Sequence, residues 1–148
     1  MELFGVLPIL EGMEKQWGIK MIFGVGIDII EIGRIKKSIE RFGDKFLNKI
    51  FTKTELEYCL SKKNKYQHFA ARFAAKEAVS KALATGWSKG FSWKDIEIFN
   101  EKNGMPRVNL LGSLKTFLGN EKSLQITMSH SEHYVTCFAI VYADKDSK

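Results

Sequence analysis

The stretch FAARFAAKEAVSKALATG, residues 69–86, predicts the helix around which the rest of the chain is organised. It is rich in alanine and carries Phe69 and Phe73 four residues apart. It ends at Thr85-Gly86, which is typical of a helix C-terminus. We therefore expect one long helix from about residue 66 to residue 84, the strongest helix signal in the chain.

Three further elements are predicted before this helix. Residues 22–30, IFGVGIDII, are β-branched and apolar, which predicts a buried strand. Residues 31–41 carry isoleucines at helical spacing, which predicts a helix. Thr52-Lys53-Thr54-Glu55 resembles a capping box, which would open a short helix to about Ser61.

Two strand pairs are predicted after the long helix. Strands at 95–99 and 107–111 flank Asn103-Gly104, a favourable hairpin turn. A short helix at 111–118 separates them from strands at 123–129 and 134–142. This order predicts an α+β fold with a single domain, in which a mainly antiparallel sheet packs against the long helix.

Composition narrows the possible partners and settings. The 148 residues include 23 Lys and Arg against 17 Asp and Glu, a net charge of +6 that favours an anionic partner. Cys59 and Cys137 cannot form a disulfide framework, so we expect a reducing, cytoplasmic setting. No run approaches the roughly 20 apolar residues of a membrane span. We expect an N-terminal extension of unknown role at 1–20, a domain at 21–143 and a polar tail at 144–148.

Asp28 is unusual for a strand residue. In GVGIDII, Gly24, Gly26 and Asp28 are expected to face one side and the isoleucines the other. Aspartate is uncommon in strands, and the glycines leave backbone bare where a ligand can approach. Two interpretations stay open: Asp28 contacts a ligand, or it caps the following helix with Glu31 completing the box.

Glu77 lies among small and apolar neighbours on the long helix, so its carboxylate needs a cation. The cation is either Lys81, four residues later, or a divalent metal such as Mg²⁺ shared with a second carboxylate. Cationic side chains on and before the helix form either a phosphate site or a solvated face. They are His68, Arg72, Lys76 and Lys81, preceded by Lys62, Lys63 and Lys65.

Three blocks together are specific, although each alone is weak. They are GVGIDIIEIGRI (24–35), FAARFAAKEAVSKALATG (69–86) and ITMSHSEHYVTCFAIV (126–141). In this order they resemble the bacterial 4′-phosphopantetheinyl transferase family, in its small holo-[acyl-carrier-protein] synthase type. The resemblance covers nearly all of residues 21–142. It implies a 4′-phosphopantetheinyl transferase-like fold and transfer of 4′-phosphopantetheine from coenzyme A to a serine of apo-acyl carrier protein, in fatty acid biosynthesis.

The resemblance also implies roles for individual residues. Asp28 and Glu77 match the family's Mg²⁺ ligands, and Lys81 matches a lysine that contacts the pyrophosphate. Ser129, His130 and Arg72 match coenzyme A contacts. Arg34 and Arg41 match the basic helix that docks the carrier protein. A homotrimer with active sites between subunits is implied as well, so that His130 would serve a neighbour's Asp28 and Glu77.

Two rival functions remain. A basic nucleic-acid-binding module would explain the charge, but not the two carboxylates, and no recognised nucleic-acid motif is present. A non-catalytic coenzyme A-binding protein would bind its ligand without needing metal. We expect neither nucleic acid nor membrane as a partner. The proton acceptor stays open between Glu77, Asp28 acting through a water, and a free water.

Overall fold

The computed structural model describes residues 20–85 and 91–144. The elements are β1 (Lys20–Glu31), α2 (Ile32–Ile50), α3 (Lys53–Leu60), α4 (Lys65–Ala82), the 3₁₀ turn η2 (Trp93–Asp95), β2 (Ile96–Asn100), β3 (Pro106–Leu110), α5 (Gly112–Leu118), β4 (Ser123–His130) and β5 (Tyr134–Asp144). Each helix and strand expected from the sequence is present, and the α+β class is confirmed. The division at residues 20 and 144 stays a prediction, because 1–19 and 145–148 lie outside the described residues.

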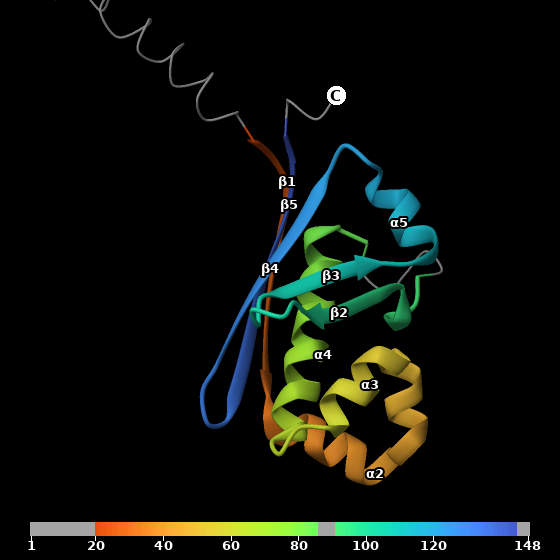
Figure 1. Cartoon of the computed structure of the whole chain (residues 1–148), viewed down its shortest axis with the longest axis vertical. Helices are drawn as coiled ribbons and strands as arrows, with labels where there is room; N and C mark the ends of the chain where they lie inside the picture. The colour runs from red at the N-terminus through yellow and green to blue at the C-terminus, as the bar shows by residue number, and fades with distance from the viewer. Residues whose placement is uncertain (1–19, 86–90, 145–148) are drawn as a thin grey trace, which may run out of the picture.

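The long helix α4 lies between two antiparallel sheets. One sheet has three strands in the order β1-β5-β4, and the other pairs β2 with β3. Figure 1 shows α4 running beside β1 and β5, with β2 and β3 on its other side. The hydrophobic core fills the space between α4 and each of the two sheets. Between α4 and the three-stranded sheet, its fully buried members include Ala74, Ala78, Cys137 and Ala139. No helix within the described ranges is both long and apolar enough to cross a membrane.

Glycines allow β1 and α4 to pack closely. A Cβ at Gly26 would lie 1.9 Å from the Ala78 carbonyl oxygen, and one at Gly24 would lie 2.0 Å from that of Ala82. The helix backbone therefore occupies the space that the sequence interpretation had assigned to a ligand. That part of the interpretation is wrong: the glycines serve helix–strand contact.

Two helix ends differ from expectation. Helix α2 continues past Arg41 to Ile50, with a bend at Gly43, whose φ of 50° is available to glycine at low cost. Ile50 beyond the bend is buried, which explains why the chain resumes the helix. Helix α4 ends with Ala84 in the left-handed region at φ 53°, while Thr85 N–H bonds the Ser80 carbonyl. The expected cap residue Gly86 lies outside the described residues.

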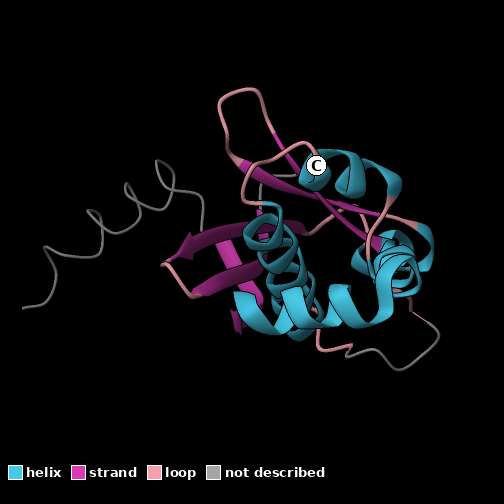
Figure 2. Cartoon of the chain, turned by 90° about the horizontal axis from the view of Figure 1, so that it is seen from below, coloured by secondary structure: helices cyan, strands magenta, loops and turns pink. Residues whose placement is uncertain are grey.

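Strand β1 is buried on one side only, which corrects the expectation of a fully buried strand. Val25, Ile27 and Ile29 are 55%, 62% and 65% exposed within the described part of the chain. Phe138 lies opposite Ile27 on β5 and is also exposed. We call these four side chains the open face. Figure 2, a view along α4, shows that helix against the other side of the sheet.

Candidate active site

Asp28 projects from the inner face of β1 toward α4. Lys81 Nζ lies 2.9 Å from Asp28 Oδ1 and donates to the Ile27 carbonyl at 2.8 Å. The Asp28 side chain is only 16% exposed. Helix α2 begins at Ile32 with Glu31 as its N-cap residue, and no side chain caps it. The capping interpretation of Asp28 is therefore wrong, and its carboxylate is directed to the flank of α4.

Glu77 lies on the same flank of α4. It is half-buried and precedes Lys81 by four residues, so both side chains leave the helix on one face. Because the Lys81 amine contacts Asp28, the flank that carries Glu77 adjoins the strand that carries Asp28. We call Asp28, Glu77 and Lys81 the carboxylate site.

The donor set of the carboxylate site fits a hard divalent cation. Within residues 20–85 and 91–144, no cluster of three or more His, Cys, Asp or Glu side chains is arranged to enclose a metal. Two carboxylates alone leave several coordination positions for water and phosphate oxygens. Mg²⁺ characteristically binds in this way, through one or two carboxylates and substrate phosphates.

A second site lies on the other flank of α4. Residues of α3, α4 and the four strands β2 to β5 line a cavity of about 260 Å³. We call it the histidine pocket; the residues that matter below are Tyr58, His68, Arg72, Asn100, Ser129 and His130. Of these, the sequence had suggested His68, Arg72, Ser129 and His130. Tyr58 and Asn100 were missed, because they belong to no motif and reach the pocket only through the packing of α3 and β2.

Arg72 supplies a buried positive charge to this pocket. It is 2% exposed, its guanidinium lies 4.0 Å above the Tyr58 ring, and Nη2 donates to Asn100 Oδ1 at 3.0 Å. Its Nε has no hydrogen-bond partner among the described residues. A buried guanidinium that lines a cavity is suited to binding an anion.

The carboxylate site and the histidine pocket are separate within one chain. Arg72 and Glu77 are five residues apart on α4, which places them roughly 140° apart around the helix axis. Asp28 pairs with Cys137 of β5, and Cys137 pairs with Met128 of β4, so β1 and β4 are two strand spacings, or about 10 Å, apart. One chain alone does not bring His130 to Asp28 and Glu77.

Lys76 does not belong to either site, which corrects its place in the cationic set. Its side chain is fully buried and lies 2.8 Å from Glu55 Oε2. It also donates to the carbonyls of Trp93 at 2.9 Å and Ile96 at 2.6 Å. Burial lowers the pKa of Lys76, and the Glu55 carboxylate opposes that change. Lys76 is therefore a structural residue.

The two arginines expected to dock a carrier protein are both exposed on α2. Arg34 and Arg41 are seven residues apart, about two turns, so they lie on one face of the helix. The Arg41 guanidinium lies 5.0 Å above the exposed Phe42 ring. Both precede the bend at Gly43.

Comparison with known proteins finds one family. The model of the 4′-phosphopantetheinyl transferase superfamily matches residues 24–139. Holo-[acyl-carrier-protein] synthase of Protochlamydia amoebophila is 51% identical over 120 residues, which span 81% of this chain and 98% of that protein.

Solved structures give the same result. A holo-[acyl-carrier-protein] synthase from Bacillus anthracis, in complex with CoA (3′,5′-ADP), is similar at a TM-score of 0.71 and 35% identity, over 84% of this chain and 99% of that one. The Helicobacter pylori enzyme in complex with coenzyme A is similar at a TM-score of 0.70 and 34% identity, over 79% and 98% of the two chains.

Proposed function

The chain belongs to the 4′-phosphopantetheinyl transferase superfamily, and from that premise we propose that it is a holo-[acyl-carrier-protein] synthase. It transfers 4′-phosphopantetheine from coenzyme A to a serine of apo-acyl carrier protein and releases adenosine 3′,5′-bisphosphate. One observation carries the proposal: a chain with this sequence similarity has a carboxylate site and a cationic pocket on the two flanks of α4. We assign the acyl carrier protein of fatty acid biosynthesis as its protein substrate.

Asp28 and Glu77 are the residues we assign to hold Mg²⁺. When bound, the ion supplies positive charge that offsets the charge developing on the pyrophosphate oxygens. Asp28 is held in place for this role by its strand, whose backbone carbonyl at Asp28 accepts a hydrogen bond from Thr136 Oγ1 at 2.9 Å. Glu77 is held by α4, which is packed on both sides.

Lys81 has a half-exposed cationic head beside the two carboxylates. Its side chain is 52% exposed, so its amine can turn from Asp28 to a pyrophosphate oxygen. The substrate serine oxygen attacks the β-phosphorus, and the bond to the adenosine bisphosphate breaks. Glu77, Asp28 acting through a water, or a free water takes the serine proton.

Coenzyme A binds through the histidine pocket as well. Arg72 contributes the positive charge of its guanidinium, and Ser129 and His130 contribute a hydroxyl and an imidazole at the end of β4. These groups suit the phosphates of the co-substrate, which carries several negative charges.

In this proposal, a homotrimer brings the carboxylate site of one subunit together with the histidine pocket of another. The open face, with Val25, Ile27, Ile29 and Phe138, is a contiguous apolar surface of the kind that marks a protein interface. Covering it with neighbouring subunits would remove this surface from water. It would also let the histidine pocket of one subunit face the carboxylate site of the next. We therefore place each active site between two subunits.

Carrier-protein docking is assigned to the exposed face of α2. Arg34 and Arg41 give that face a positive charge, and acyl carrier proteins are acidic. Complementary charge raises the association rate and weakens with salt. A cytoplasmic location is part of the proposal, supported by two buried free thiols, Cys59 and Cys137.

The decisive experiment is mass spectrometry of apo-acyl carrier protein after incubation with the full-length chain, coenzyme A and Mg²⁺. We expect a mass gain of one phosphopantetheine, and no gain when EDTA removes the metal. Coenzyme A binding with no transfer would instead support a non-catalytic carrier. DNA binding with a steep salt dependence, and no coenzyme A binding, would support a nucleic-acid-binding module.

A further inference from the structure

His68 is a titratable residue of the histidine pocket to which the proposed reaction assigns no role. It lies on α4, one turn before Arg72, and lines the same cavity as His130 of β4. Its ring meets the Tyr58 ring edge-on, with centroids 5.5 Å apart. The pocket thus places two imidazoles and a buried guanidinium around one space of about 260 Å³.

We propose that His68 is a further ligand of the phosphate group that binds in this pocket, and that it takes up a proton when the phosphate binds. The inference rests on the proposed function, because that function makes coenzyme A the source of the phosphate. His68 would then make the affinity for coenzyme A depend on pH.

The charges around His68 favour an anion. Arg72 faces it from its own helix, Lys62 from the turn after α3, and His130 from β4. The other polar side chains that line the cavity are those of Tyr58, Gln67, Asn100 and Ser129. No acidic side chain is among the described residues that line the cavity. An entering phosphate therefore meets donors and positive charge without a competing carboxylate.

Proton uptake follows from the same arrangement. Burial lowers the pKa of His68, and the nearby positive charges of Arg72, Lys62 and His130 lower it further. His68 is therefore neutral in the empty pocket near neutral pH. A bound phosphate brings negative charge that favours the imidazolium and raises this pKa again. By linkage, the ligand then binds more tightly as the pH falls.

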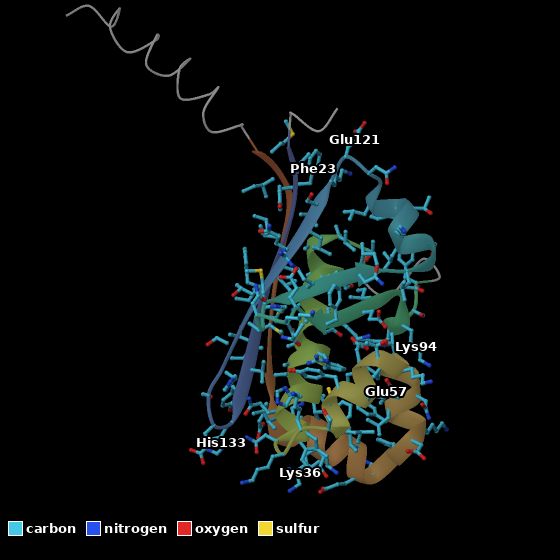
Figure 3. All side chains as sticks on the ribbon, viewed as in Figure 1. Phe23, Lys36, Glu57, Lys94, Glu121 and His133 are labelled. Atoms are coloured by element: carbon cyan, nitrogen blue, oxygen red, sulfur yellow. The ribbon has the colours of Figure 1, made fainter. Side chains whose placement is uncertain are left out.

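The test is calorimetry of adenosine 3′,5′-bisphosphate and of coenzyme A with the full-length protein at pH 6 and pH 8. Buffers of different ionisation enthalpy report the number of protons taken up. His68→Phe keeps the ring against Tyr58 but cannot be protonated. His133→Phe is the matched control: His133 is the histidine that does not line the pocket, its side chain is 72% exposed, and Figure 3 shows it at the tip of the β4–β5 turn.

Each variant is compared with wild type at the same pH, because the phosphate itself titrates near pH 6 and changes the affinity of every variant. We expect His68→Phe to weaken binding about threefold at pH 6 and very little at pH 8, as for one proton whose pKa rises by about one unit from below the usual histidine range. Proton uptake should fall in this variant and stay at the wild-type value in His133→Phe. If His68→Phe does not fold, as judged by circular dichroism, His68→Gln replaces it.

Dephospho-coenzyme A, which lacks the 3′-phosphate, shows which phosphate of coenzyme A His68 contacts. Loss of the His68-dependent proton uptake with this ligand would assign His68 to the 3′-phosphate, and its retention to the pyrophosphate. Equal affinity and proton uptake in His68→Phe and wild type would overturn the inference alone. Absence of binding of either nucleotide to the wild-type protein would overturn the proposed function, and the inference with it.

Discussion

Lys76 and Glu55 form an ion pair of 2.8 Å in which neither side chain has any exposed surface. The carboxylate also accepts hydrogen bonds from the backbone of Thr52 at 2.8 Å and Ile98 at 2.9 Å. The amine donates to two carbonyls near the start of β2. The pair therefore ties α3, α4 and β2 together. It also fixes the orientation of α4 about its own axis at Lys76, the residue directly before Glu77.

Removing the amine should destabilise the fold. We expect Lys76→Met to lower the free energy of unfolding by about 3–5 kcal/mol, because it leaves the Glu55 carboxylate buried without its cation. Urea denaturation measures this change. The double variant Glu55→Gln/Lys76→Met should recover part of the loss, since no uncompensated charge remains. A loss of less than about 1 kcal/mol in the single variant would contradict a buried charged pair.

Gly26→Ala should separate β1 from α4. The added Cβ would lie 1.9 Å from the Ala78 carbonyl oxygen, so backbone must move. We expect a loss of about 3 kcal/mol in the free energy of unfolding. Gly33→Ala on α2 is the control, since its Cβ would meet only the Glu31 side chain at 3.4 Å. That variant should be neutral or more stable by up to about 1 kcal/mol. Similar losses in both variants would argue against close strand–helix packing.

Loss of either carboxylate should abolish transfer but preserve the fold. We expect Asp28→Asn and Glu77→Gln each to lower kcat/KM by about 100-fold or more, as for removal of a group that stabilises transition-state charge. Thermal unfolding should shift by only a few degrees. Glu121→Gln, an exposed carboxylate before β4 (Figure 3), is the control and should keep its activity. Full activity in either site variant would remove the metal assignment.

Reversal of charge on α2 should affect one substrate only. Arg34→Glu should raise the KM for carrier protein about tenfold, through lost charge complementarity, and leave the KM for coenzyme A nearly unchanged. Lys115→Glu makes the same change in charge on α5, at the far end of the molecule in Figure 1, and should raise neither KM. Equal increases for both substrates in Arg34→Glu would argue against a docking role.

A charge on the open face should dissociate the proposed trimer. Ile27 is 62% exposed in the single chain, and an aspartate there would be buried without a partner in the assembly. Light scattering should give about three times the 16.9 kDa chain mass for wild type and the monomer mass for Ile27→Asp. Leu60→Asp, on exposed α3 surface, should leave the mass unchanged. A monomeric wild-type protein would overturn the trimer.

The candidate site could be found only in part from the sequence. Asp28 and Glu77 were notable because a strand and an alanine-rich helix have little use for a carboxylate. Which cation meets Asp28 was not evident, because Lys81 is separated from it by 53 residues of chain. Tyr58 and Asn100 carry no sequence signal for the histidine pocket. They contribute because α3 and β2 pack beside Arg72.

Local sequence by itself determined which segments of this protein form helices, strands and turns. The Thr52–Glu55 capping box and the turn with Gly104 at φ 88° depend on residues a few positions apart, so their neighbours suffice to specify them. Tertiary structure alone decided which way the α4 side chains point. Successive residues of a helix differ by about 100° in direction, so packing between two sheets buries Lys76 and leaves Glu77 on the flank beside β1.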